Sequence, residues 1–164
     1  MADDAILILT TGGTIDKVYF DALSAYQIGE ATVTGILEMG RVTRPFVVEE
    51  VMRKDSLDVT DGDRARIVEH VARSSAHRVV VTHGTDTMTE TARALRTVPG
   101  KVIVLVGALT PARFAQSDAA FNLGMAFAAV QVAQPGVYIT MSGSVFPEGA
   151  VVKDRAAGAF TVGG

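Results

Sequence analysis

Short apolar segments alternate with stretches of helical spacing along most of this chain. Segments rich in Val, Ile and Leu, which are typical of buried parallel strands, lie at residues 6–9, 46–52, 78–82, 101–106 and 137–141. Between them, the spacing of apolar positions predicts helices at residues 31–38, 61–74, 86–96 and 117–133. This alternation predicts an α/β fold, a doubly wound three-layer α/β/α domain with a mostly parallel sheet, Rossmann-like or flavodoxin-like.

Two segments depart from this rhythm. Residues 15–29 combine Tyr, Asp, Ser and Gly without a clear period, and we expect a long loop there, of the kind that is usually functional or disordered. Towards the C-terminus, residues 145–146 and 151–152 predict short strands, whereas residues 156–159 lack the pattern of a packed element. We expect no second domain.

Composition agrees with a packed globular domain and excludes several functions. The 164 residues are 48% hydrophobic and 20% charged, with a net charge of -3 and no cysteine. Acidic and basic residues are interspersed, so neither nucleic acid nor an anionic membrane is expected as a partner. Thiolate metal sites and cysteine nucleophiles are excluded, and no histidine pair has a zinc spacing. With Asp3 and Asp4 at the start and no apolar stretch of the ~18 residues that a span needs, we expect a cytoplasmic protein.

Two threonine-rich motifs follow the ends of predicted strands. A Thr-Thr-Gly-Gly-Thr motif occupies residues 10–14, and a His-Gly-Thr-Asp-Thr motif occupies residues 83–87. The carboxyl ends of parallel strands meet at one edge of an open sheet, where α/β folds bind ligands. The motifs therefore bring the hydroxyls of Thr14 and Thr85 to one crevice.

Each motif also has a plainer interpretation. A threonine hydroxyl is a weak nucleophile that needs a base or a polarising neighbour, and threonines in such a turn often only satisfy backbone groups. Asp86 falls at the start of a predicted helix, where its carboxylate either caps free amides or faces the crevice. A phosphate loop is disfavoured because its glycine spacings are missing. Hydroxyls, backbone donors and one aspartate, without metal ligands, suit a small zwitterion better than a phosphate.

Together the two motifs resemble the amino-terminal domain of the bacterial-type L-asparaginases, threonine amidohydrolases that release ammonia from asparagine and, less efficiently, from glutamine. The resemblance continues through Asp-Ser-Leu-Asp at residues 55–58, Gly-Ala-Leu-Thr-Pro at residues 107–111 and Val-Val-Lys at residues 151–153. It implies a single amino-terminal-type α/β domain over residues 1–164, without the family's carboxyl-terminal domain. It also implies hydrolysis of L-asparagine to L-aspartate and ammonia with no cofactor and no metal.

The same resemblance implies a nucleophile and a substrate-binding set. Thr14 would form the acyl-enzyme, and Tyr26, or Tyr19 if the loop is shifted, would orient its hydroxyl. The residues that would bind the substrate are Gly13, Asp55, Ser56, Gly84, Thr85 and Asp86.

A second catalytic group is implied as well, in which Thr85 positions water while Asp86 and Lys153 tune it. A lysine beside a carboxylate is favoured as the ammonium. We therefore expect Lys153 to be an electrostatic and hydrogen-bonding partner of Thr85 rather than a base. His83, in the same motif, is expected to be a structural hydrogen-bonding residue.

Two departures from the family pattern affect the expected function. Leu57 stands where many members place a glutamine, so we expect altered affinity or specificity. The family's second domain normally supplies an acidic residue to the neighbour in a dimer, and Glu148 and Asp154 are candidates to replace it. A domain without its usual partner exposes an apolar patch, which favours a homodimer or larger homo-oligomer. The alternatives to an L-asparaginase are an amino-acid-binding regulatory module with little turnover and a subunit of a larger amidotransferase.

Overall fold

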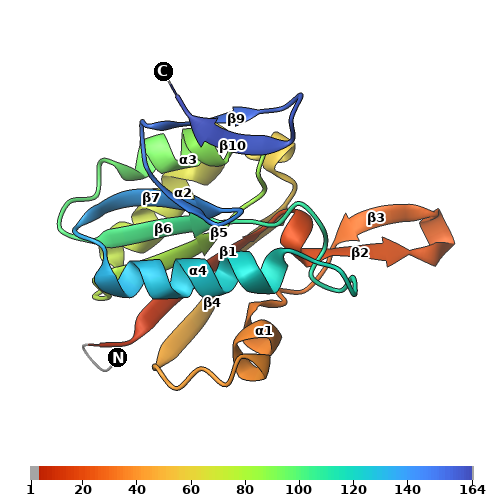
Figure 1. The fold of residues 1–164 in the computed structure, drawn as a ribbon, viewed down its shortest axis with the longest axis horizontal. Coiled ribbons are helices and arrows are strands. Elements are labelled where there is room, and N and C mark those ends of the chain that lie inside the picture. The colour runs from red at the N-terminus through yellow and green to blue at the C-terminus, as the bar shows by residue number, and fades with distance from the viewer. Residues whose placement is uncertain (1–3, 164) are drawn as a thin grey trace.

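A six-stranded sheet lies between two layers of helices in the computed structural model, which describes residues 4–163 (Figure 1). Across the sheet the order is β4-β1-β5-β6-β7-β8, parallel except for β8. The bounds are β1 Ile6–Gly12, β4 Phe46–Lys54, β5 Arg78–Thr82, β6 Val102–Val106, β7 Gly136–Met141 and β8 Ser144–Pro147. Numbered along the chain, the parallel strands lie in the order 2-1-3-4-5, which is the flavodoxin-like order. The predicted doubly wound α/β fold is confirmed.

The strands are apolar on both sides because helices cover both faces of the sheet. On one face, Leu7 and Leu9 of β1 pack in the core beneath α2 and α3. On the other face, Ile6 and Ile8 pack beneath α1 and α4. The helices are α1 Val33–Met39, α2 Asp61–Arg73, α3 Met88–Leu95 and α4 Ala119–Val132. None of the helices within residues 4–163 has both the length and the hydropathy that crossing a membrane requires.

The start of α2 is fixed by a capping box. The Thr60 hydroxyl accepts from the Asp63 amide at 3.2 Å, and the Asp63 carboxylate accepts from the Thr60 amide at 2.9 Å. Lys54 also donates to this carboxylate, at 2.7 Å. The bonds from Lys54 and Thr60 lower the pKa of Asp63 to about 2.

Residues 15–29 form a hairpin rather than the expected long loop. Strands β2 (Lys17–Phe20) and β3 (Ala25–Ile28) pair antiparallel, and Ser24, with φ 46°, makes the turn between them. Cross-strand packing explains the pairing, because the rings of Tyr19 and Tyr26 lie opposite each other with centroids 5.4 Å apart. The β2–β3 hairpin projects from the body of the molecule (Figure 1).

The C-terminal segment contains one strand more than predicted. Strand β9 (Val151–Asp154) pairs with β10 (Ala159–Val162), a strand that the sequence did not predict, and residues 156–158 lie in the turn between them. The hairpin is held because Val151 and Phe160 are buried in the core, whereas Val152 and Val162 are exposed. It lies over α3 (Figure 1).

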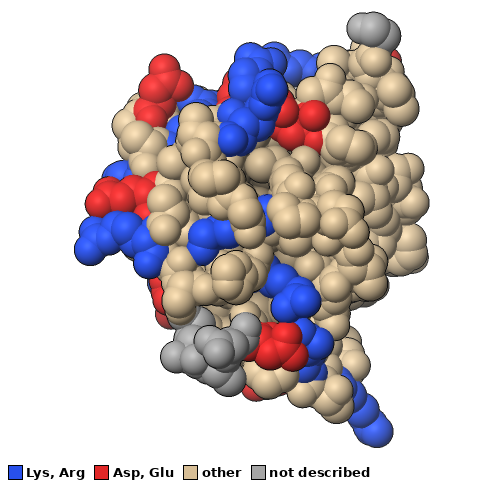
Figure 2. All heavy atoms as spheres, turned by 90° about the vertical axis from the view of Figure 1, so that its left-hand side faces the viewer, with Lys and Arg blue, Asp and Glu red and all other residues tan. Residues whose placement is uncertain are grey.

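Charges of both signs are interspersed on the face where the parallel strands begin (Figure 2). Uncharged residues cover most of that face, and no continuous field of one sign is present on it. This face therefore offers no basic stripe of the kind that nucleic acids require.

Candidate active site

The ends of β1 and β5 touch through their backbones at two glycines. A side-chain carbon at Gly13, where φ is 90°, would lie 2.5 Å from the amide nitrogen of Gly84. One at Gly84 would lie 2.5 Å from the Cβ of Ser56. Only glycine permits these approaches. Thr14 and Thr85 follow directly, so the two motifs meet between β1 and β5, where the strand order reverses and α/β folds bind ligands.

Thr85, Asp86 and Lys153 form one hydrogen-bonded group beside this contact. The Lys153 Nζ donates to the Thr85 Oγ1 at 2.7 Å and to the Asp86 Oδ1 at 2.5 Å. Thr85 is 6% exposed, and the Lys153 side chain is 12% exposed. Because the Thr85 oxygen accepts from a cation, its own proton remains available to a further acceptor. The structure thus brings Lys153 to two residues that lie 68 and 67 positions earlier in the chain.

Asp86 does not cap the following helix. Helix α3 begins at Met88, and Thr87 occupies the N-cap position without a side-chain capping bond. Of the two interpretations of Asp86, helix capping is therefore wrong, because the carboxylate is turned to Lys153 instead.

Ser56 joins the same group from the end of β4. Its hydroxyl oxygen accepts from the Asp86 amide at 3.1 Å, and its carbonyl accepts from the Thr87 hydroxyl at 2.7 Å. The residue is 2% exposed. Ser56 thus lies against the β5–α3 turn, next to Thr85.

Asp55, the neighbouring residue expected to bind substrate, is engaged elsewhere. Its carboxylate forms an ion pair with Lys17 at 2.9 Å and accepts from the Leu57 amide at 3.2 Å. Partial burial opposes ionisation, but the bonds from Lys17 and Leu57 outweigh it and lower the pKa of Asp55. In this structure the carboxylate ties the β2–β3 hairpin to the end of β4.

Thr14 starts a short 3-10 turn at the base of the β2–β3 hairpin and is partly exposed. Its hydroxyl makes no hydrogen bond to another residue within the described part of the chain. Tyr26 is 52% exposed, and its ring lies between those of Tyr19 and Phe114, the latter at a centroid distance of 6.2 Å. The structure therefore gathers both candidate tyrosines into one aromatic cluster and bonds neither to Thr14.

His83 has the structural role that the sequence predicts. It is fully buried, and burial lowers its pKa to about 4, so the ring is neutral near pH 7. Its Nδ1 lies 2.7 Å from the Gly84 carbonyl, which only accepts, so this nitrogen carries the proton. Its Nε2 then accepts from the Thr91 hydroxyl at 2.8 Å.

The proposed replacements for a second-domain acid are not free. Glu148 pairs with Arg96 at 3.2 Å and lies beside Val137, at the edge where β7 begins, opposite the glycine contact. Asp154 accepts from the amides of Ala156 and Ala157, at 2.9 and 3.0 Å, and so forms the β9–β10 turn. Glu148 thus lies away from the site of its own chain, and local backbone bonds use the Asp154 carboxylate.

Sequence reasoning assigned no role to two residues that shape the loop after β6. The Asp118 carboxylate accepts from the amides of Leu109 and Thr110, each at 2.9 Å. Asn122 donates to the Gly107 carbonyl at 3.1 Å and accepts from the Ser142 amide at 3.0 Å. The available signal was a pair of polar residues four positions apart in an otherwise apolar helical segment, since such residues share one helix face.

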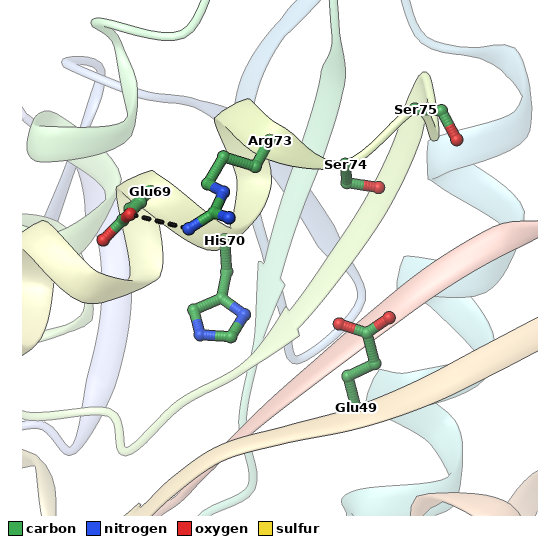
Figure 3. Close-up of a pocket in the computed structure, with 6 residues that line it drawn as sticks. All are labelled: Glu49, Glu69, His70, Arg73, Ser74 and Ser75. Atoms are coloured by element: carbon green, nitrogen blue, oxygen red, sulfur yellow. Dashed lines mark hydrogen bonds and ion pairs between the residues drawn. The ribbon is translucent and has the colours of Figure 1, made fainter.

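A separate hollow lies beside the connection from α2 to β5 (Figure 3). Arg73 there is paired with Glu69 at 3.0 Å, and Glu49 reaches the hollow from β4. The lining residues are Glu49, Glu69, His70, Arg73, Ser74 and Ser75. Within residues 4–163 no cluster of three or more His, Asp or Glu side chains is arranged to hold a metal ion. The hollow lies where β5 begins, so it is separate from the group of Thr85, Asp86 and Lys153 at the strand ends.

The fold and site define a flavodoxin-like α/β domain with a threonine, lysine and aspartate group at its topological switch point. The chain belongs to the asparaginase family, because the family model described as "Asparaginase, N-terminal" matches residues 5–161. It is 32% identical to a glutaminase-asparaginase of Acinetobacter glutaminasificans, over 90% of this chain and 49% of that protein. It is 37% identical to a glutamyl-tRNA(Gln) amidotransferase subunit of Pyrobaculum aerophilum, over 76% of this chain and 31% of that protein.

Solved structures give the same result. The thermostable L-asparaginase from Thermococcus kodakarensis superposes with a TM-score of 0.82 at 27% identity, covering 96% of this chain and 51% of that one. A probable cytoplasmic L-asparaginase from Campylobacter jejuni gives a TM-score of 0.83 at 30% identity, covering 97% and 53%. The chain thus spans about half the length of these relatives.

Proposed function

We propose that this protein hydrolyses L-asparagine to L-aspartate and ammonia through a threonine acyl-enzyme, with weaker action on L-glutamine. The observation that carries the proposal is the bonded group of Thr85, Asp86 and Lys153 beside the backbone contact that also delivers Thr14. Membership of the asparaginase family supports an amidohydrolase.

In the first step the Thr14 hydroxyl oxygen attacks the side-chain amide carbon of the substrate. A carbon–oxygen bond forms, the threonine proton passes to the departing nitrogen, and the carbon–nitrogen bond breaks to release ammonia. Tyr26, or Tyr19 in its place, orients the Thr14 hydroxyl by moving with the β2–β3 hairpin. An aspartyl ester on Thr14 remains.

In the second step water cleaves this ester. Thr85 positions the water, and the Lys153 ammonium stabilises negative charge on the reacting oxygen. Water adds to the ester carbon, the Thr14 oxygen leaves and regains its proton, and L-aspartate is released. Asp86 keeps Lys153 in place in both steps, and no cofactor takes part.

The amino acid part of the substrate is held by the segments around Thr85. Gly13 and Gly84 allow the backbones of the two turns to approach each other closely, which brings Thr14 and Thr85 to the same ligand. Ser56, Thr85 and Asp86 supply polar contacts to its α-carboxylate and α-ammonium. Asp55 acts through the position of Ser56, because its own carboxylate is paired with Lys17.

A second candidate function is that of one component of a larger amidotransferase, which releases ammonia from glutamine. The 37% identity to the amidotransferase subunit of Pyrobaculum aerophilum favours it. It uses the same threonine chemistry and differs in needing a partner that receives the ammonia.

We further propose that the chain assembles into a homo-oligomer. The outer surface of α1 and α4 exposes large apolar side chains, with Phe121 61%, Val132 80% and Met39 82% exposed. Apolar surface of this kind is usually buried between subunits. Light scattering at working concentrations is expected to give a mass above that of one chain, and a strict monomer would contradict the proposal.

The decisive experiment measures ammonia release from L-asparagine and L-glutamine by the purified protein, beside the variants Thr14→Ala and Thr85→Ala. We expect turnover on L-asparagine that either substitution abolishes. Calorimetric titration with L-aspartate accompanies the assay.

Each other outcome selects an alternative. Binding of L-aspartate without ammonia release indicates a regulatory module. Release from glutamine only when a co-purified partner is present indicates a component of an amidotransferase. A folded protein that neither binds L-aspartate nor releases ammonia would contradict all three functions.

A further inference from the structure

Thr87 sits at the N-cap of α3 but uses its hydroxyl in an unusual direction. A threonine at this position normally accepts a hydrogen bond from an amide in the first helical turn. Here no such bond forms, and the backbone has φ -123° and ψ 21°. The hydroxyl instead donates to the carbonyl of Ser56 at 2.7 Å, across 31 positions of the chain.

A second bond between the same two segments runs in the same direction, from the turn to Ser56. The amide of Asp86 donates to the Ser56 hydroxyl oxygen at 3.1 Å. The two bonds therefore close a ring that contains Ser56, Asp86 and Thr87. Two bonds at different atoms of Ser56 fix both the distance and the rotation of one segment against the other, which a single bond does not.

This ring holds one side of the turn that carries Thr85, while Lys153 holds the other. The Asp86 carboxylate points to Lys153, and its amide points to Ser56. Ser56 is 2% exposed, so water does not readily replace either bond. The Ser56 hydroxyl oxygen already accepts from the Asp86 amide through one lone pair. Its proton is still available to donate to a ligand.

We propose that Thr87 is a positioning residue for substrate binding, which fixes Ser56 and Asp86 in the relative placement that the amino acid requires. The proposal rests on the function proposed above. Thr87 itself does not touch the substrate, and it acts by holding the Ser56 carbonyl.

The variant Thr87→Val tests this proposal, because valine keeps the branched shape and removes the hydroxyl. The Ser56 carbonyl then loses its partner, so we expect the KM for L-asparagine to rise about tenfold and kcat to change less than about threefold. Thr87→Ser restores the donor and is expected to restore the KM. The matched control is Thr97→Val, which removes a threonine hydroxyl that donates to the Ala94 carbonyl at 3.0 Å beyond the other end of α3.

Amide hydrogen exchange gives a readout that does not depend on turnover. In Thr87→Val the Asp86 amide is expected to exchange faster than in the wild-type protein, and in Thr97→Val at the wild-type rate. This comparison stands even if the wild-type protein releases no ammonia, so failure of the positioning role is distinguishable from failure of the proposed function.

Three results would overturn the positioning role. The first is an unchanged Asp86 exchange rate in Thr87→Val. The second is a lower melting temperature with an unchanged KM in an active enzyme, which would make the bond merely structural. The third is a KM that Thr87→Ser fails to restore.

Discussion

Thr85 and Thr14 follow glycines that touch each other, yet their surroundings differ. Thr85 is 6% exposed and bonded to Lys153, which also binds Asp86. Thr14 is partly exposed, and its hydroxyl is bonded to no other residue within residues 4–163. Beyond Thr14, the β2–β3 hairpin exposes about half of the Tyr26 side chain, at 52%.

The site thus has two halves, one around Thr85 and one around Thr14 with the β2–β3 hairpin. The difference between them follows from how each half is anchored. Segments from β4, β5 and β9 converge on Thr85, so its neighbours are fixed by the sheet and by the C-terminal hairpin. The hairpin after Thr14 is fixed at its base, where the buried carboxylate of Asp16 accepts from the Thr32 amide at 2.8 Å. A catalytic site needs rigid groups where charge is stabilised and a movable segment where substrate enters. The Thr85 half suits the first task and the Thr14 half the second.

Removing the cation from the rigid half is expected to have the largest effect. Lys153→Met keeps most of the side-chain length and leaves Thr85 and Asp86 without their shared partner. We expect ammonia release to fall about 10³-fold, because the charge that stabilises the reacting oxygen is gone. Lys101→Met is the control, since Lys101 donates to the carbonyls of Ser74 and Ala76, both at 2.6 Å, near the start of β5 and away from the site. A Lys153→Met enzyme that keeps a tenth of its activity would contradict the assignment.

Replacing each tyrosine of the movable half by phenylalanine distinguishes the catalytic role of Tyr26 from that of Tyr19. We expect Tyr26→Phe to lower kcat about 10²-fold, in the range of losing a group that assists proton transfer. Tyr19→Phe, on the opposite strand of the same hairpin, is expected to leave kcat close to the wild-type value. Steady-state kinetics of both variants on L-asparagine decide the question. The reverse ranking would transfer the role to Tyr19.

The sheet and the rigid half were predictable because their signals are local. Apolar runs mark the strands, and the glycines of the two motifs mark the close approach at their ends. The β2–β3 hairpin was missed because cross-strand contacts such as Tyr19 with Tyr26 stabilise it, and these have no period along the chain. Strand β10 was missed for the same reason, since its place depends on pairing with β9.

Site details that depend on distant contacts also escaped prediction. Nothing near Asp86 in the sequence shows that its carboxylate meets Lys153 instead of capping α3. Asp55 looks like a free acid until Lys17 is placed beside it. The resemblance to a family supplied the residues and the expected bond of Lys153 to Thr85, which the fold confirms, and the fold added the contacts of Ser56 and Asp55.

The protein is expected to lose stability against unfolding in mild acid because of His83, which is buried in the rigid half. Its pKa falls from 6.5 to about 4 on burial, so between these values the unfolded chain binds a proton that the folded protein excludes. Stability therefore decreases as pH falls from about 6.5 to 4, by about 3 kcal/mol at most from this group. Urea unfolding across that range is expected to show that the free energy of unfolding falls less steeply with pH in His83→Gln than in the wild-type protein. His70→Gln, on the exposed face of α2, is the control, and equal slopes for His83→Gln and wild type would contradict the assignment.

The smallest effect is expected at the base of the movable half, where Lys17 pairs with Asp55. Their side chains are 28% and 31% exposed, so the pair contributes at most about 1 kcal/mol. Lys17→Met is expected to raise KM about two- to threefold, which corresponds to a fraction of that energy. Hydrogen exchange in residues 17–28 is expected to quicken.

The informative measurement is the hydrogen-exchange rate of the Asp86 amide in Lys17→Met. Asp55 directly precedes Ser56, which holds that amide, so a connection between the two halves is available. We expect no change at Asp86, because Ser56 is also held by Thr87 and packs against Gly84. The surface pair of Arg73 with Glu69 provides the control, since Arg73→Met is expected to alter neither region. Faster exchange at both the hairpin and Asp86 would show that the two halves of the site move together, and the division between a rigid and a movable half would fail.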